Sequence, residues 1–364
     1  MLIFAAEMSK LFIFNPEHDI ALASNLSNFT APHAGRQLRA DLGFLPALWA
    51  DDGDAVLVDH VDYAEKIWHR LAKRLAIAKN PVFLPRQQQL THSAFNDISP
   101  WGWDKALVAE LKRRGADSSL LPDTAQLNHI QQLSHRRTAA ALLTRLQTEG
   151  TVGEAYECTQ GDEVEQLLAR YKQVVMKAPW SSSGRGIRFL STDHTPFQTQ
   201  ASWFRHVVER QGSVMVEPFY RKVKDFGMEF VADGNGSVHY EGLSIFHTIN
   251  GAYVGNILAT EATKLQMISR YIPICLLEDI KQKIISCVDL GSYQGPFGID
   301  MMIVSNSDQF PTHNSPLYLH PCVELNLRRT MGHVALSLMP QDDDIVKVMR
   351  IELTDNYKLK IRKL

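Results

Sequence analysis

The segment that most constrains this chain is 322–329 (Cys-Val-Glu-Leu-Asn-Leu-Arg-Arg), in which polar and apolar residues alternate. Side chains of a β-strand point alternately to its two faces, so Glu324, Asn326 and Arg328 share one face. The leucines between them can be buried on the other face. Carboxylate and amide oxygens suit Mg²⁺, and a guanidinium suits phosphate or carboxylate. The alternative is an ordinary exposed strand face that carries an ion pair between residues two apart.

A single acid, Asp300, interrupts an otherwise apolar strand pattern at residues 297–304. An unpaired buried carboxylate is costly, so Asp300 needs a partner. We expect strands at 299–304 and 318–327 to pair across a polar linker, which brings Asp300 to the strand next to Glu324. A metal ion shared by the two acids would satisfy both. The alternative is an edge-strand aspartate with ordinary hydrogen bonds.

A strand expected at residues 174–176 leads into Lys177 and then into a loop of small residues that ends at Gly186. Serine and glycine let backbone N–H groups approach a polyphosphate, and Lys177 and Arg185 would offset its charge. The alternative is a plain flexible hairpin loop. The sequence contains no Walker loop, and no G-x-G-x-x-G opens a helix.

Composition excludes several classes of protein. Lys and Arg total 38 and Asp and Glu total 40, for a formal net charge of -2, which argues against a chain that coats nucleic acid or an anionic membrane. Hydrophobic residues make up 45%, which excludes wholesale disorder. No apolar stretch reaches the ~18 residues of a membrane span. The cysteines lack C-x-x-C spacing, which favours a reducing cytoplasm over a disulfide scaffold or zinc ribbon; they are Cys158, Cys275, Cys287 and Cys322.

The chain of 364 residues is long enough for two or three lobes. Strands alternate with helices over the first third, which predicts an open α/β lobe. The expected strands there are 11–14 and 55–58, and the expected helices are 63–77 and 103–114. Further on, we expect a helix at 134–146, strands at 187–190, 214–216 and 228–232, a hairpin turn at 233–236, and a closing hairpin with a basic tip at 345–361.

Taken in order, these pieces resemble the ATP-grasp superfamily of ATP-dependent carboxylate–amine or carboxylate–thiol ligases, over residues 134–333. The E-x-N-x-R string at Glu324 is the most specific element of the resemblance. It implies an α/β (α+β) fold, with an N-terminal open α/β lobe followed by a two-lobed ATP-grasp with antiparallel sheets. The implied boundaries are 1–125 for the N-terminal domain, 126–216 for a small lid subdomain and 217–364 for a metal-binding, catalytic subdomain.

The resemblance also implies roles for single residues. Lys177 and Arg328 match the catalytic cations, and Asp300, Glu324 and Asn326 match the Mg²⁺ ligands, with Mn²⁺ as an alternative metal. The other residues expected to bind ATP are Arg136 (with Arg137 as its alternative), the loop residues Ser182, Ser183, Gly184, Arg185 and Gly186, the adenine-reading segment Glu217, Pro218 and Phe219, and the ribose ligand Asp225.

The implied reaction activates a small carboxylate as an acyl phosphate and joins it to an amine, releasing ADP and phosphate. An amino acid or peptide is the class of substrate that this chemistry suggests. Two alternatives remain open, a non-catalytic ATP-binding regulatory protein of the same fold and a small-molecule phosphotransferase. Neither nucleic acid nor a membrane is expected as a partner, and a homo-oligomer is compatible with the family.

Two segments could select the substrate. Residues 15–19 (Asn-Pro-Glu-His-Asp) follow the first strand, where open α/β sheets bind ligands, although the same residues also suit a helix start. Residues 246–256 are dense in Gly, Asn and aromatic side chains and are expected as a loop that lines a pocket or simply connects two strands. Met8 precedes an apolar strand and is an alternative start to Met1.

Overall fold

The computed structural model describes residues 9–90, 95–181, 186–249, 252–305 and 316–364. The chain forms two compact units. The first comprises residues up to Gln131 together with Met349–Ile361, and the second comprises Gln132–Val348 with Arg362–Leu364. Within those described ranges, every helix is too short or too polar to cross a lipid bilayer.

The first unit contains a parallel four-stranded sheet, as the alternation of strands and helices predicted. Its strands are β1 (Ser9–Ile13), β2 (Ala55–Val58), β3 (Val82–Pro85) and β4 (Phe95–Pro100). They lie in the order β3-β2-β1-β4, so the chain winds outward from β1 in both directions. The apolar residues of β1 (Leu11–Ile13) and all of β2 are buried because helices of this unit cover the sheet.

The helices of the first unit follow the expected spacing. α3 (Val61–Leu75) buries Ala64, Trp68 and Ala72, four residues apart, on one face and ends where Ala76 adopts a left-handed conformation. α4 (Lys105–Arg113) begins at Asp104, whose side chain accepts a hydrogen bond from the Leu107 N–H. The remaining helices are α1 (His18–Ser24), α2 (His33–Leu42) and α5 (Thr124–Leu133), with 3₁₀ turns at Leu45–Leu48 and Ser118–Leu120.

The C-terminal hairpin forms as expected, but its tip is not basic. β14 (Lys347–Leu353) and β15 (Tyr357–Lys363) are joined by a polar turn at residues 354–356, and the basic residues lie along the strands instead. The Asn356 side chain and the Tyr357 N–H donate hydrogen bonds of 3.0 and 2.8 Å to the Asp41 carboxylate. These bonds fix the hairpin within the first unit.

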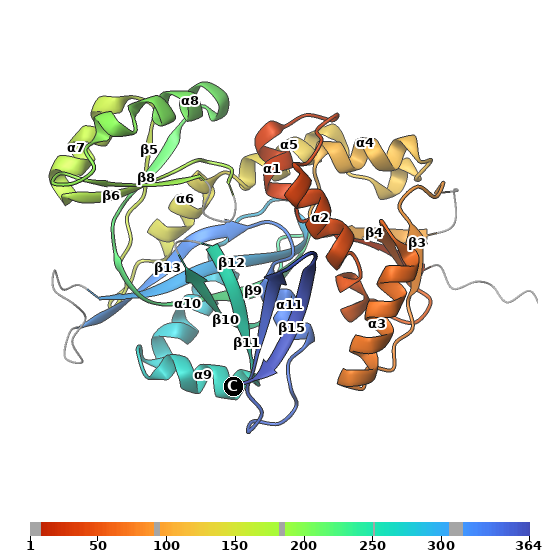
Figure 1. Ribbon diagram of the computed structural model, residues 1–364. Helices are drawn as coiled ribbons and strands as arrows, with labels where there is room; N and C mark the ends of the chain where they lie inside the picture. The colour runs from red at the N-terminus through yellow and green to blue at the C-terminus, as the bar shows by residue number, and fades with distance from the viewer. Residues whose placement is uncertain (1–8, 91–94, 182–185, 250–251, 306–315) are drawn as a thin grey trace, which may run out of the picture. The chain divides into compact units, whose positions relative to one another are not determined.

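The second unit contains a small antiparallel sheet in the order β5-β8-β6-β7. Its strands are β5 (Tyr156–Cys158), β6 (Gln173–Lys177), β7 (Ile187–Ser191) and β8 (Val214–Pro218). α7 (Gly161–Tyr171) and α8 (Ala201–Gln211) pack against one face (Figure 1). Alternate residues of β6 and β8, such as Val174 and Val216, enter this core, which leaves the residues between them on the other face.

A larger antiparallel set of strands in the second unit runs in the order β13-β12-β9-β10-β11. The strands are β9 (Arg221–Asp233), β10 (Val238–Ile249), β11 (Ala252–Leu258), β12 (Gln294–Ser305) and β13 (Leu317–Asn326). The accompanying helices are α6 (Arg136–Leu146), α9 (Glu261–Ser269), α10 (Ile274–Cys287) and α11 (Met331–Ser337). A short 3₁₀ turn, Phe197–Thr199, packs instead with α7 and α8 against the small sheet. α6 packs against β13, and α11 against β10 (Figure 1).

The expectation of a loop at 246–256 was wrong. The described residues of this segment belong to β10 and β11, which pair with one another from Phe246 opposite Asn256 to Ile249 opposite Ala252. Gly255 and Asn256 pair with His247 and Phe246, and the register shifts between His247 and Thr248. The pairing of β12 with β13, in contrast, was predicted from the polar linker between them and is confirmed.

Candidate nucleotide and metal site

Lys177 lies at the end of β6, on the face opposite the helix-packed core. Glu217 lies on the neighbouring strand β8, diagonally across the register from it. The Lys177 Nζ is 2.6 Å from Glu217 Oε2, and both side chains are less than 10% exposed. Both groups are therefore held rigidly, as an ion pair that shields each charge from an apolar surrounding.

The predicted metal ligands face one another across β12 and β13. Asp300 is directly opposite Glu324, and Gly298 is opposite Asn326. The Asn326 Nδ2 donates to Asp300 Oδ2 at 3.3 Å, and the Arg328 Nη2 donates to Asn326 Oδ1 at 2.9 Å. The alternating sequence pattern therefore brings an acid pair, an amide and a guanidinium into one chain of contacts, as the pattern predicted.

Burial and a neighbouring like charge both act on Asp300. The loss of water around Asp300 and the negative charge of Glu324 raise the pKa of the Asp300 carboxyl to about 7, while Arg328 and the Asn326 amide act in the opposite direction. Two facing carboxylates and an amide oxygen are the hard oxygen ligands that Mg²⁺ takes in proteins. The donor set therefore fits a divalent cation, although no three His, Cys, Asp or Glu side chains converge on one point in the described ranges. Phosphate oxygens and water would have to complete the coordination.

Arg136 contacts both halves of the site, the half on β6 and β8 with Lys177 and the half on β12 and β13 with Glu324. It begins α6 and is 8% exposed. Its Nε donates to the Ala178 carbonyl at 3.1 Å and its Nη2 to the Ser181 carbonyl at 3.4 Å, on the segment that follows Lys177. The same Nη2 is 2.8 Å from Glu324 Oε1. Its alternative, Arg137, is mostly exposed and pairs with Glu157 instead.

Cys322 is a buried thiol on β13, two residues before Glu324. Burial, followed by the charges of Glu217 and Asp300, raises its pKa well above the ordinary range.

Other predicted nucleotide ligands are engaged in contacts of their own. Asp225 Oδ2 accepts from the Lys222 ammonium and from the Thr248 hydroxyl, each at 2.6 Å. The Phe219 N–H donates to the Gln173 carbonyl at 3.0 Å, and Pro218 has no N–H to offer. Phe219 instead exposes its ring (41%), which meets Phe189 edge-on at 6.0 Å.

The loop that follows Lys177 falls largely outside the described residues. This applies to Ser182, Ser183, Gly184 and Arg185, all predicted to contact phosphate. The end of the loop is described, and the Ala178 N–H donates to the Gly186 carbonyl at 2.8 Å. This bond joins the two ends of the loop next to Lys177.

Comparison with solved structures identifies the fold. Biotin carboxylase from Campylobacter jejuni, solved as a β-γ-ATP complex, matches 95% of this chain and 76% of its own, with a TM-score of 0.50 and 13% identity. The chain has the ATP-grasp fold. At this identity the likeness is one of fold.

Two further matches have TM-scores of 0.49 and 12% identity. N5-carboxyaminoimidazole synthetase from Staphylococcus aureus, complexed with ADP, is matched over 95% of this chain and 82% of its own. The biotin carboxylase domain of Hydrogenobacter thermophilus 2-oxoglutarate carboxylase, with MgADP, ADP and bicarbonate, is matched over 94% and 74%. No protein-family model and no curated protein sequence matches the chain.

Sequence reasoning assigned no role to one acid of this ATP-grasp fold, Glu229 on β9. It is 3% exposed, and burial, followed by the charge of Asp300, raises its pKa to about 8. The His333 Nδ1 lies 3.1 Å from Glu229 Oε2, and burial lowers the pKa of His333 to about 3. Both pKa shifts are explained if the His333 imidazole is neutral and the Glu229 carboxyl is protonated. The signal in the sequence was an acid inside an apolar strand at residues 226–232.

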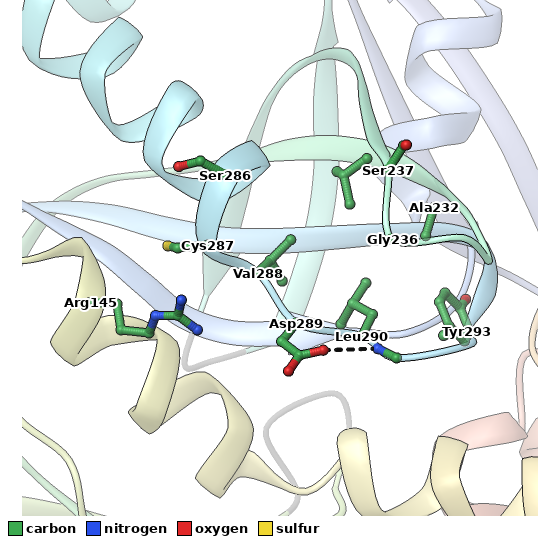
Figure 2. A pocket seen from close by; sticks show the side chains of 12 residues that line it. Arg145, Ala232, Gly236, Ser237, Ser286, Cys287, Val288, Asp289, Leu290 and Tyr293 are labelled. Carbon is green, nitrogen blue, oxygen red and sulfur yellow. Dashed lines mark hydrogen bonds between the residues drawn. The ribbon is translucent and has the colours of Figure 1, made fainter.

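The close-up in Figure 2 shows a pocket elsewhere in the ATP-grasp fold. Its volume is about 200 Å³, and it lies among Arg145 of α6, the β9–β10 turn and the segment after α10. Asp289 there accepts a hydrogen bond of 3.1 Å from the Gly291 N–H, within its own turn. None of the residues predicted for ATP or metal binding lines this pocket.

Proposed function

We propose that this chain is an ATP-dependent ligase that activates a small carboxylate and joins it to an amine. The observation that carries the proposal is that Arg136 contacts both parts of the site. It donates to the Ala178 and Ser181 carbonyls, which follow Lys177, and pairs with Glu324, which lies opposite Asp300. A polyphosphate needs cations along its length and a metal site at its reacting end, and these two parts supply both kinds of group.

In the proposed reaction, a carboxylate oxygen of the substrate attacks the γ-phosphorus of ATP. ADP leaves, and an acyl phosphate forms. An amine then attacks the acyl carbon, phosphate leaves with the bonding electron pair, and the amine loses a proton to give an amide. No side-chain nucleophile is required, which fits a site composed of cations, acids and an amide.

The residues of this chain act by holding and aligning the reactants. Lys177 and Arg328 would offset the negative charge that shifts between phosphate oxygens during transfer. Arg136 would hold the start of the phosphate loop in place through its bonds to backbone carbonyls. Asp300, Glu324 and Asn326 would hold Mg²⁺, which when bound neutralises phosphate oxygens. Mn²⁺ satisfies the same oxygen ligands.

Turnover with a pooled substrate set tests the proposal. The full chain is incubated with MgATP and the common amino acids and short peptides, and ADP and new masses are followed. ADP together with an amide product supports ligation. A phosphorylated product without an amide indicates a phosphotransferase, and nucleotide binding without turnover indicates a regulatory protein; either result overturns the ligase.

Two variants test the site. Lys177→Ala and Glu324→Ala are each expected to lower the rate of ADP formation by about 10²–10³, the loss typical for a group that stabilises transferring charge. Lys66→Ala, an exposed lysine on α3, serves as the control and should keep the wild-type rate. ADP formation and MgATP binding that survive unchanged in both site variants would show that the site is assigned to the wrong residues.

A further inference from the structure

The first unit contains a second polar site, at the point where its parallel sheet changes direction. β1 lies between β2 and β4, so the connections leaving β1 and β4 diverge from neighbouring strands. In open α/β sheets ligands bind beyond the carboxyl ends of the strands at such a point. Residues 14–18 follow β1, and residues 101–104 follow β4. The sequence alone marked only the first of these segments.

Buried polar groups form hydrogen bonds between the two segments. The Asn15 Nδ2 donates to the Gly102 carbonyl at 2.8 Å and to Asp104 Oδ2 at 3.3 Å, and the Gly102 N–H donates to Asn15 Oδ1 at 3.4 Å. The His18 Nδ1 lies 3.4 Å from the same Asp104 oxygen. Asn15, His18 and Asp104 are each at most 3% exposed. These bonds hold the two segments together at the end of the sheet.

Gly102 is required by this packing. A Cβ atom at this position would lie only 2.7 Å from the His18 ring, so any other residue would displace the imidazole. The ring therefore rests directly on the backbone that follows β4. Both segments are fixed in place before any ligand arrives, which lowers the entropy cost of binding.

Glu17 lies in this framework with unused capacity for a hydrogen bond. Its side chain is 9% exposed, and its Oε1 pairs with Arg39 Nη1. The Arg39 Nε also donates to Asp59 Oδ2 at 3.0 Å, so one guanidinium serves two carboxylates. The Glu17 Oε2 is buried and, among the described residues, meets no hydrogen-bond donor. A buried carboxylate oxygen without a donor costs free energy that a bound N–H group would recover.

We propose that this site binds a primary ammonium group, with Glu17 Oε2 as its acceptor. The carboxylates of Glu17 and Asp59 share the one guanidinium of Arg39, so this group of three side chains is net negative, which favours a cation over an anion. A charged N–H donor also forms the strongest hydrogen bond with a carboxylate. The ligand is then an amine or amino acid, and only its role as a ligation substrate rests on the proposed function.

Binding to the full chain without nucleotide tests this inference. The probes are the common amino acids, their methyl esters, which keep the ammonium but lose the carboxylate, and their N-acetyl forms, which lose the ammonium. At least one amino acid and its ester should bind, and its N-acetyl form should bind at least tenfold more weakly. If the N-acetyl form binds equally well, or if no probe binds, the inference is wrong and only water donates a hydrogen bond to Glu17.

Variants assign the binding to Glu17. Glu17→Gln keeps the shape of the side chain but removes its charge, and should weaken binding of the same amino acid about tenfold or more, which is the loss of a charged hydrogen bond. Glu65→Gln, an exposed acid on α3, should bind as the wild type does. Unchanged binding by Glu17→Gln overturns the inference.

Asp59→Asn decides the matter if Glu17→Gln does not fold. It frees Arg39 to pair fully with Glu17, so affinity for the amino acid should fall severalfold while Glu17 itself is retained; unchanged affinity is contrary to the inference.

The two proposals can fail independently of each other. Glu17-dependent binding without ADP formation supports this site and not the ligase, whereas ADP formation stimulated by an amino acid that Glu17→Gln binds as tightly as the wild type supports the ligase and not this site.

Discussion

Each half of the candidate site places two charged side chains on neighbouring antiparallel strands, but the electrostatics of the two halves are opposite. On β6 and β8 they are Lys177 and Glu217, which neutralise each other at 2.6 Å. On β12 and β13 they are Asp300 and Glu324, which repel. The first pair is complete in itself. The second is compensated only in part, by Arg136 at Glu324, and a cation from outside the chain would compensate the rest.

The largest effect is expected from breaking the neutral pair. Lys177→Met leaves Glu217 buried without its cation, and the free energy of unfolding should fall by about 3–4 kcal/mol, because an unpaired buried charge is strongly unfavourable. Urea denaturation at neutral pH, followed by circular dichroism, measures the loss. Lys66→Met, on an exposed helix face, is the control and should stay within about 0.5 kcal/mol of the wild type.

A second substitution sharpens this test. Glu217→Leu in the Lys177→Met background removes the stranded carboxylate and should recover most of the lost stability. If the double variant is no more stable than Lys177→Met alone, the loss arises from packing rather than from the unpaired charge.

The acid-rich half is expected to respond to pH. The pKa of Glu229, about 8, lies above the ordinary carboxyl value, so the folded protein holds a proton that the unfolded chain releases. The stability contributed by this group is full at low pH and is lost as pH rises from about 4.5 to about 8. The charged and polar groups that face it are Asp300, Thr330, Arg328, Lys264 and His333.

Glu229→Gln should flatten this pH dependence. We expect the wild-type free energy of unfolding to fall by up to about 1 kcal/mol per pH unit more steeply than that of Glu229→Gln between pH 5.5 and 8. Thermal or urea unfolding across this range, with EDTA present, measures the two slopes. Glu209→Gln, an exposed acid on α8, should follow the wild type. Parallel slopes for Glu229→Gln and wild type would rule out the protonated carboxyl.

The smallest effect has the opposite sign to the first. Asp300→Asn removes one of two facing like charges and keeps an oxygen that can accept from Asn326. In metal-free protein at pH 8 it should raise the free energy of unfolding by roughly 1 kcal/mol or less. Denaturation in EDTA measures this gain. If Asp300→Asn instead lost as much stability as Lys177→Met, the Asp300–Glu324 pair would stabilise the fold as the Lys177–Glu217 pair does, and the difference between the two halves would be wrong.

Local pattern was enough to predict the strands that carry the site. The alternation around Glu324 and the apolar run around Asp300 have the period of a strand, and their pairing followed from the linker between them. The strand that ends at Lys177, the strand that follows the small-residue loop and the strand expected at 214–216 were also predicted in this order. They correspond to β6, β7 and β8. The roles of the individual residues in ATP and metal binding stay predictions.

The features that sequence reasoning missed all depend on contacts between distant segments. Arg136 reaches Glu324 across 188 positions of the chain, and nothing near either residue signals that ion pair. Glu229 acquires its raised pKa from burial and from the charge of Asp300, which lies on another strand. The segment at 246–256 was misjudged because Gly and Asn favour turns locally, whereas the ladder between β10 and β11 overrides that preference.

We propose that both halves of the candidate site bind one magnesium nucleotide. The most direct measurement is the affinity of the full chain for ADP with and without Mg²⁺, in the wild type and in Asp300→Asn/Glu324→Gln. The wild type should bind ADP at least about tenfold more tightly with Mg²⁺, and the double variant should lose this gain while keeping the metal-free affinity provided by Lys177. An equal gain from Mg²⁺ in both proteins, or no binding of ADP by the wild type, would contradict the account.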